Sequence, residues 1–147
     1  MMSLININDA CKAIRDNWES LTNEFFKQQP GKYLVLTTVH RTLETQFGLY
    51  QKGREKLPTG DWMVTDKSQV VTNVDGFKNI GAHNYFPSRA IDVAVVDNQT
   101  GQTLWEENHY HCLVEIASRL GLESGGSWKS LKDWPHIQVP NFKEYKE

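Results

Sequence analysis

The sequence Ala90-Ile91-Asp92-Val93-Ala94-Val95-Val96 is one of two clear strand signals in this chain. It is apolar and rich in β-branched residues, and a turn at residues 97–101 closes it. Because successive side chains of a strand point to opposite faces, Asp92 shares one face with the two small alanines, whereas the isoleucine and the alternate valines face the other way. The pattern predicts a strand with one face in the core and the other forming the floor of a site.

The sequence allows three environments for the Asp92 side chain. An isolated carboxylate inside an apolar strand would be costly to bury. The side chain is therefore held by backbone or arginine hydrogen bonds, or meets water on a polar face of the strand, or binds a metal ion. The strand pattern alone leaves all three open.

Periodicity and turn residues predict the other elements of the chain. The predicted helices, which carry apolar residues at helical spacing, are 8–27 (capped by Asn8 or Asp9), 43–53 and 106–120. The predicted strands, which are rich in β-branched and aromatic residues, are 32–39, 62–65, 90–96 and 136–139. Residues 141–147 are expected to form a loose tail. Because helices and strands do not alternate regularly, we expect an α+β fold, with a mainly antiparallel sheet and packed helices, rather than a parallel doubly wound sheet.

Composition is typical of an ordinary globular protein. Hydrophobic residues make up 39% of the chain, charged residues 23%, and the formal net charge is -2, so no global basic field attracts nucleic acid. The first eight residues show no signal peptide, and no run of about eighteen apolar residues predicts a membrane span. We expect a single domain over residues 1–147, monomeric and without stable membrane association. Cys11 and Cys112 are expected to be free thiols, with a disulfide between them as the alternative.

Two histidines and the strand aspartate are candidate metal ligands. His83 follows a glycine-containing loop, and His136 begins the last predicted strand. Zinc favours imidazole and carboxylate ligands, and catalytic zinc sites typically use three protein ligands and leave one position for water. His83, Asp92 and His136 fit that rule, although their wide separation makes spacing a weak signal.

The other histidines give weaker signals. His109 and His111 are expected to be ordinary helix residues, although His111 with Glu115, or His109 with Cys112, would share a helix face and imitate a metal motif. His40 is a candidate to line the same cleft.

Three strings of residues together resemble a known family. Residues 83–93, His-Asn-Tyr-Phe-Pro-Ser-Arg-Ala-Ile-Asp-Val, resemble the zinc-binding segment of the D-alanyl-D-alanine carboxypeptidase (VanY-like) metallopeptidases, and most closely the phage endolysin branch. Residues 133–138, Asp-Trp-Pro-His-Ile-Gln, are similar to a second signature, an acidic residue three places before the last ligand histidine. Residues 41–46, Arg-Thr-Leu-Glu-Thr-Gln, provide a third match. The resemblance covers a core of about residues 33–139.

The resemblance implies a role for each matching residue. The implied zinc ligands are His83, Asp92 and His136; the implied general base is Asp133; the residue that stabilises charge on the tetrahedral intermediate is Arg41; and the residue that positions the peptide is Gln46. The chemistry is consistent, because zinc lowers the pKa of water to about 7, a nearby carboxylate manages the proton, and an arginine stabilises the developing oxyanion. The alternative readings are a surface ion pair for Arg41 and a turn residue for Asp133.

The sequence departs from the family pattern near the first two ligands. The family places fewer residues between its histidine and aspartate than the eight that separate His83 from Asp92. Ser88 stands where relatives often carry a glycine, so we expect altered substrate contacts there.

A geometric problem concerns the last two site residues. Pro135 holds the residue before it extended and forbids an ordinary helix. On a flat strand, three-residue spacing would point Asp133 and His136 to opposite faces. A turn or bulge must therefore bring them together.

The resemblance implies a zinc-dependent peptidoglycan endopeptidase, an endolysin that hydrolyses the L-alanyl-D-glutamate bond of the stem peptide. The alternatives are a D-alanyl-D-alanine carboxypeptidase with the same zinc chemistry, and a non-catalytic wall-binding or virion module that retains the metal site. Asp133 and Arg41 favour an enzyme, because structural zinc needs neither and usually has four protein ligands. We expect synthesis in the host cytoplasm, action on the bacterial cell wall in the periplasm after release, and no separate wall-binding domain.

Overall fold

An antiparallel sheet forms the centre of the molecule in the computed structural model, which describes residues 5–147. The first four residues, part of the segment without a signal-peptide pattern, lie outside the described residues. Along the sheet the strands follow the order β1-β4-β7-β6, and β5 also pairs with β4. The strands are β1 (Lys32–Thr38), β4 (Ala90–Asp97), β5 (Thr103–Leu104), β6 (Glu123–Gly125) and β7 (Asp133–Gln138). All their pairings are antiparallel, which confirms the predicted α+β class.

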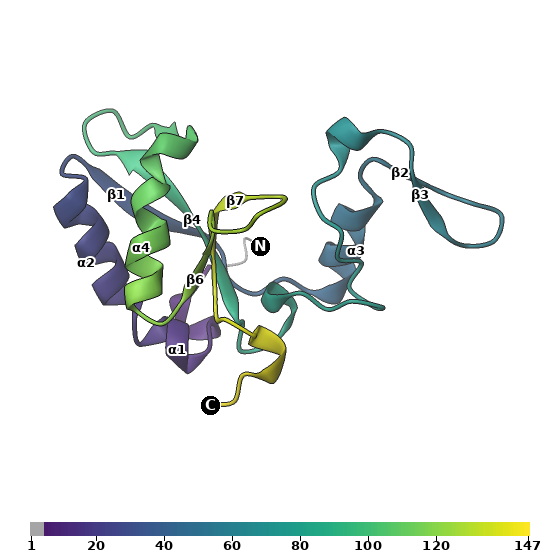
Figure 1. Cartoon of the computed structure of the whole chain (residues 1–147), viewed down its shortest axis with the longest axis horizontal. Helices are drawn as coiled ribbons and strands as arrows, with labels where there is room; N and C mark the ends of the chain where they lie inside the picture. Colours follow the sequence, from purple (N-terminus) through teal and green to yellow (C-terminus); the bar gives the residue numbers. More distant parts are fainter. Residues whose placement is uncertain (1–4) are drawn as a thin grey trace.

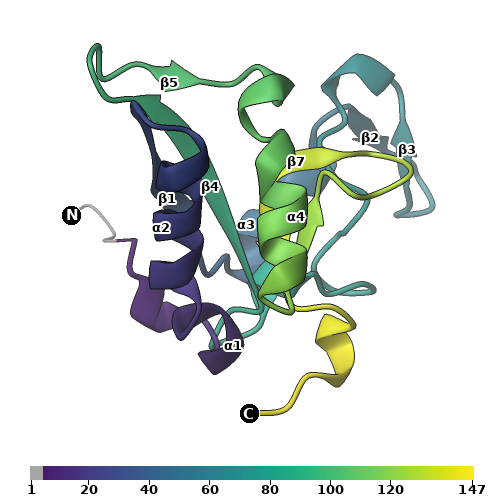
Figure 2. The same ribbon diagram turned by 60° about the vertical axis from the view of Figure 1, so that its left-hand side comes forward.

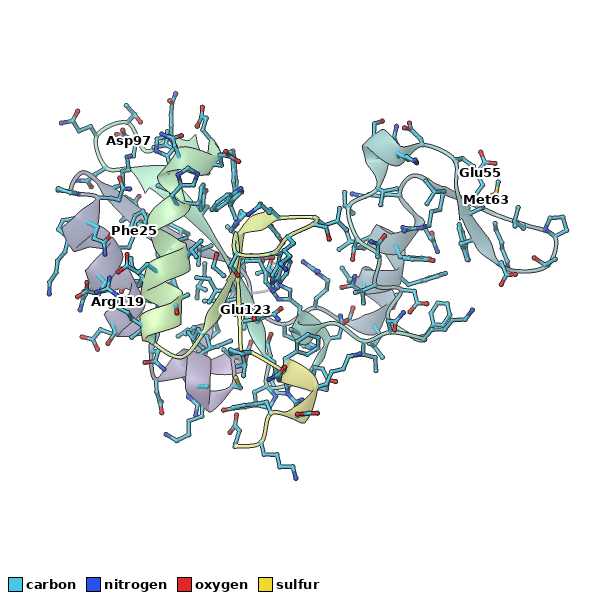
Figure 3. All side chains as sticks on the ribbon, in the orientation of Figure 1. Phe25, Glu55, Met63, Asp97, Arg119 and Glu123 are labelled. Carbon is cyan, nitrogen blue, oxygen red and sulfur yellow. The ribbon has the colours of Figure 1, made fainter. Side chains whose placement is uncertain are left out.

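Two helices cover one face of this sheet. Helix α2 (Trp18–Gln28) and helix α4 (His111–Arg119) lie side by side across it (Figures 1 and 2). Phe25 of α2, labelled in Figure 3, is fully buried in the core. The core also contains the large side chains of β4, namely Ile91, Val93 and Val95. The predicted core face of β4 is therefore confirmed, and its opposite face is free to carry a site.

The single helix expected over residues 8–27 is wrong. The segment forms a 3-10 turn at Ile7–Asp9, capped by the Asn6 side chain, and then the separate helices α1 (Lys12–Arg15) and α2. The two residues before α1 are extended, and the Cys11 N–H donates to the Ser88 carbonyl at 2.7 Å. A tertiary backbone contact here overrides the local helical periodicity.

Residues 43–81 form an arm that extends from the other side of the sheet (Figure 1). It contains α3 (Leu43–Gln51) and the hairpin of β2 (Arg54–Lys56) and β3 (Trp62–Val64). The predicted strand near 62–65 is confirmed, whereas β2 was not predicted. Phe47 of α3 contacts the rings of Tyr50, Trp62 and Phe77, so an aromatic cluster holds the arm together. Glu55 and Met63 project from the hairpin far from the sheet (Figure 3).

The tail at residues 141–147 is anchored, so the expectation of a loose tail is wrong. Arg89 Nη1 donates to the Phe142 carbonyl at 2.6 Å, and the Tyr145 hydroxyl accepts the Ala13 N–H at 3.1 Å. Both aromatic residues pack against the core. Two aromatic contacts and two hydrogen bonds offset the conformational entropy that ordering this segment costs.

The remaining elements lie close to their predicted positions. A 3-10 turn (Glu107–His109) precedes α4 inside the predicted 106–120 helix, and β7 begins before the predicted 136–139 strand. Cys11 and Cys112 are free thiols, as expected. Among the described residues, no helix has the length and apolar character needed to cross a membrane.

Asp75 fixes the loop that returns from the arm. Its Oδ1 accepts the backbone N–H groups of Phe77, Lys78 and Asn79 at 2.9 to 3.0 Å. Burial opposes ionisation of this carboxyl, but the three donors outweigh burial and lower its pKa below the ordinary value of 3.8. Next to it, Gly76 adopts a φ of +90° and packs directly on the arm helix, which favours glycine at this position.

We predict that Asp75→Asn lowers the free energy of unfolding by about 1–3 kcal/mol at pH 7, because a neutral amide replaces a carboxylate that accepts three bonds. A depressed folded-state pKa contributes stability that is present above the unfolded value and is lost as the pH falls through the folded value. Urea unfolding of both proteins should therefore show a smaller difference at about pH 3 than at pH 7. An equal difference at both pH values would contradict this account.

Candidate metal centre

Three side chains from separate segments meet on the face of β4 opposite the core. His83 comes from the 3-10 turn Ala82–Asn84, Asp92 from β4 and His136 from β7. Their ligand atoms all lie within 4.8 Å of one another. Asp92 and His136 are direct partners in the β4–β7 register. The structure thus brings together the three residues that the sequence suggested, despite the unusual spacing of the first two.

His83 presents a bare nitrogen to this cluster. Its Nδ1 lies 2.8 Å from the Val39 carbonyl, which can only accept, so Nδ1 carries the proton. Its Nε2 is buried without a hydrogen-bond partner, and it lies 3.2 Å from Asp92 Oδ1. A lone pair on Nε2 that faces the carboxylate is unfavourable unless a proton or a metal ion lies between the two atoms. The donor set therefore fits a metal ion.

Asp92 carries the negative charge of the cluster. Burial opposes its ionisation, but His136 and His83 outweigh burial and hold its pKa far below the usual range. Burial likewise opposes protonation of His136, but the Asp92 carboxylate raises the pKa of that imidazole. One ionised carboxylate and two imidazoles are ligand types that zinc prefers.

Asp133 lies at the edge of the cluster. Its Oδ2 is 4.0 Å from His136 Nδ1, and about half of its side chain (51%) is exposed. Partial burial, together with the negative charge of Asp92, raises the pKa of the Asp133 carboxyl. A solvent-accessible carboxyl with a raised pKa is suited to accept and release a proton.

A bulge in β7 brings Asp133 and His136 to the same site. One step along β6, from Ser124 to Gly125, corresponds to four steps along β7, from Ile137 to Asp133. The expectation of a turn or bulge is therefore confirmed. Gly125 is needed at this position because a Cβ there would collide with the carbonyl of Asp133.

Arg41 reaches the cluster from the segment before the arm. Its Nη2 lies 3.6 Å from Asp92 Oδ2, and its Nη1 donates to Gln46 Oε1 at 3.2 Å. Gln46 is buried, and its amide nitrogen donates to the Val74 carbonyl at 2.9 Å and to Thr72 Oγ1 at 3.4 Å. The Gln46 amide is thus used inside the protein. This geometry favours a role in holding Arg41 over the direct peptide contact that the sequence suggested.

Ser88 has no exposed surface, so the expectation that it alters substrate contacts is wrong. Its Oγ lies 2.7 Å from the Val39 carbonyl and 2.6 Å from the Ala90 carbonyl. The Val39 carbonyl also accepts from His83. Ser88 therefore helps to fix the Val39 carbonyl, which orients the candidate ligand His83.

The other histidines have partners elsewhere. His40 lies edge-on to the ring of Phe86, with 5.2 Å between ring centroids. His109 Nδ1 is 2.9 Å from the Lys32 ammonium, and His111 lies 4.7 Å from Trp134 between ring centroids.

Sequence reasoning missed two residues next to His136. Gln138 Oε1 lies 2.8 Å from His136 Nε2, and the ring of Trp128 is 5.1 Å from the imidazole between centroids. Period two along β7 was a signal for the first, because Gln138 follows His136 by two residues. No local pattern gave Trp128 a role beside His136.

Comparisons with known proteins bear on this site. Residues 76–139 match the family described as D-alanyl-D-alanine carboxypeptidase. The chain is 34% identical over 125 residues to the peptidoglycan L-alanyl-D-glutamate endopeptidase CwlK of Bacillus subtilis (strain 168). This match covers 76% of this chain and 64% of that relative. The fold is similar to the crystal structure of the Serratia marcescens L-Ala D-Glu endopeptidase ChiX, with a TM-score of 0.55 and 18% identity over 91% of this chain and 83% of that chain. The chain thus spans less than two thirds of the curated relative's length.

We predict that Gly125→Ala lowers the free energy of unfolding by about 1–3 kcal/mol, because the added methyl group must displace the Asp133 carbonyl and with it the bulge. Gly48→Ala is the matched control, since nothing lies within 4 Å of a Cβ at that position in α3 and alanine favours a helix. Urea unfolding measures both changes. A Gly125→Ala protein as stable as the parent would show that the bulge does not depend on this glycine.

Proposed function

We propose that this chain, whose residues 76–139 match the family described as D-alanyl-D-alanine carboxypeptidase, is a zinc-dependent peptidoglycan endopeptidase. The observation that carries the proposal is the buried cluster of His83, Asp92 and His136, in which the Nε2 atom of His83 has no hydrogen-bond partner. The bond that we propose is L-alanyl-D-glutamate in the stem peptide, which the name of the relative CwlK supports.

The proposed zinc ligands are His83 Nε2, the Asp92 carboxylate and His136 Nδ1, the atoms that face one another in the cluster. Zinc, when bound, supplies a Lewis acid that makes water more acidic and polarises a carbonyl group. The protein supplies an ionised carboxylate and two imidazoles, and hydrogen bonds to groups outside the cluster hold the imidazoles in place. Little reorganisation is therefore needed to bind the ion.

Asp133 manages the proton in this proposal. Its carboxylate takes the proton of the attacking water and passes it to the departing amine nitrogen. The raised pKa of Asp133 favours holding the proton between these two events. Its exposed edge gives the substrate access to the carboxyl group.

Arg41 stabilises charge on the reacting carbonyl oxygen. Its guanidinium lies at the cluster and is oriented by Gln46 and by the Asp92 carboxylate. A donor that is fixed before the reaction stabilises the developing oxyanion without reorganisation at that moment.

We predict that Asp133→Asn lowers the rate of digestion of purified peptidoglycan by about 10²- to 10⁴-fold while zinc content stays at the parent level. The control is Asp16→Asn, which changes an exposed aspartate at the end of α1. Chelation of the metal should abolish the activity of the parent, and added zinc should restore it. An active Asp133→Asn protein would remove Asp133 from the role of base.

The same digests identify the bond by mass spectrometry. Cleavage between L-alanine and D-glutamate releases stem peptides that begin with D-glutamate. The family description favours one alternative, a D-alanyl-D-alanine carboxypeptidase. Products that lack the terminal D-alanine and are otherwise intact would establish that alternative and contradict the endopeptidase.

We further propose that the enzyme is a phage-type endolysin that reaches the cell wall from the host cytoplasm after release. The Pro-Ser-Arg-Ala string at residues 87–90 supports this origin. Expression in a host is predicted to cause lysis only when the inner membrane is also permeabilised. Lysis without permeabilisation would contradict the proposed route.

A further inference from the structure

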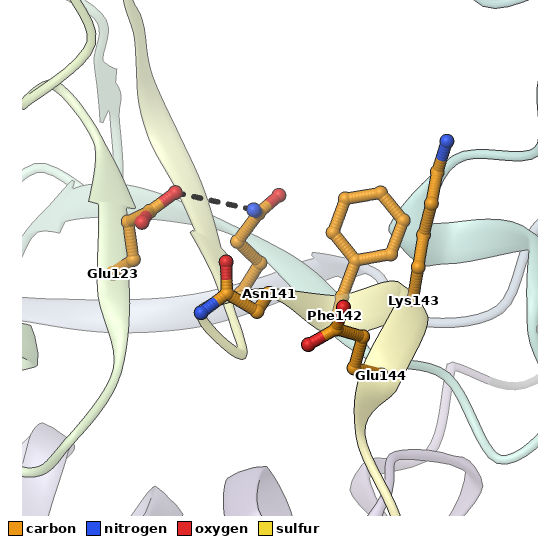
Figure 4. Close-up of a pocket in the computed structure, with 6 residues that line it drawn as sticks. Glu123, Asn141, Phe142, Lys143 and Glu144 are labelled. Atoms are coloured by element: carbon orange, nitrogen blue, oxygen red, sulfur yellow. Dashed lines mark hydrogen bonds between the residues drawn. The ribbon is translucent and has the colours of Figure 1, made fainter.

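A chain of hydrogen bonds leads away from His136 on the side opposite the cluster. His136 Nε2 lies 2.8 Å from Gln138 Oε1, and Gln138 Nε2 donates to Glu123 Oε2 at 3.2 Å. The indole Nε1 of Trp128 donates to the same Glu123 oxygen at 3.0 Å. Figure 4 draws the bond that reaches the Glu123 carboxylate as a dashed line. The proposed function gives no role to Gln138, Glu123 or Trp128.

The chemistry of the groups fixes the direction of each hydrogen bond in this series. The indole of Trp128 can only donate, and the Glu123 carboxylate can only accept. The end of the Gln138 amide that faces Glu123 must therefore be its NH₂ group, and its oxygen must face His136. Since that oxygen can only accept, His136 Nε2 carries a proton.

The sheet holds these hydrogen-bonded side chains in place. His136 and Gln138 lie two residues apart on β7 and so share a face of the strand. Gln138 is the register partner of Glu123 on β6. Both His136 and Gln138 are buried, with 7% and 8% of their surface exposed. Side chains on paired strands are positioned more accurately than side chains on loops.

We propose that Gln138 and Glu123 are positioning residues that determine which nitrogen of His136 binds the metal. With Nε2 committed to Gln138, the nitrogen left for a metal is Nδ1, which lies 3.2 Å from Asp92 Oδ1. The Val39 carbonyl does the reverse at His83, where it engages Nδ1 and leaves Nε2. The cluster thus presents its two imidazoles through different nitrogens, each fixed by a group outside the cluster. The consequence for zinc rests on the proposed function.

Removal of the Gln138 acceptor releases this constraint. A neutral His136 is then free to move its proton to Nδ1 and donate to Asp92, which removes the lone pair that would bind the metal. Loss of such an outer partner typically weakens metal binding by about 10- to 100-fold.

The experiment compares the parent with Gln138→Leu, which keeps similar bulk and removes the acceptor. Zinc affinity is measured by competition with a chelator, and the proton on His136 Nε2 is followed by NMR with ¹⁵N-labelled histidine. We expect the parent to show a slowly exchanging Nε2–H, with and without zinc. Gln138→Leu is expected to lose that slow exchange and to bind zinc about 10- to 100-fold more weakly. Gln102→Leu, at an exposed site in the turn before β5, is the matched control. Its zinc affinity and its His136 Nε2–H exchange should equal those of the parent.

A second variant keeps the test decisive if Gln138→Leu does not fold. Glu123→Gln preserves the shape of the side chain but ends the requirement that Gln138 present its oxygen to His136. We therefore expect a smaller loss of zinc affinity and a smaller increase in Nε2–H exchange than in Gln138→Leu. Parent-like zinc affinity and parent-like Nε2–H exchange in the folded variants would overturn the inference. So would a parent protein whose His136 carries its proton on Nδ1 alone. If the parent binds no zinc, the proposed function fails, and the Nε2–H comparison in metal-free protein still decides the inference.

Discussion

The buried carboxylate of Asp92 is the constraint on which the rest of the site depends. A charge on a central strand is costly unless it is paired and hydrogen-bonded. Asp92 is flanked by imidazoles on two sides and by the Arg41 guanidinium on a third. Burial opposes its ionisation, but the two imidazoles outweigh burial, lower its pKa and keep it ionised. The same arrangement leaves the Nε2 atom of His83 without a partner, which is the property expected of a site that binds a cation.

The fold supplies these partners from three directions. The helices cover one face of the sheet and leave the other face of β4 for polar groups (Figure 1). The segment before the arm brings Arg41, and the bulge in β7 brings Asp133 beside His136. The bulge requires glycine at position 125, and the arm requires the turn that Asp75 holds. Packing on one face of the sheet thus fixes the chemistry on the other.

The sequence predicted the strand at residues 90–96 well, because period-two alternation separates Asp92 from the core side chains. Family resemblance, not local pattern, suggested His83 and His136, since ligands from distant segments have no common periodicity. The helix predicted over residues 8–27 failed because a backbone bond from Cys11 to Ser88 interrupts it. Gln138 was missed because its role depends on Glu123, which only the strand register places beside it.

We propose that His83, Asp92 and His136 hold one zinc ion. Anomalous diffraction from crystals of zinc-loaded protein, measured at the zinc absorption edge, locates the ion. We expect one strong peak within bonding distance of His83 Nε2, the Asp92 carboxylate and His136 Nδ1. A peak elsewhere in the molecule, or one bound through His136 Nε2, would contradict it.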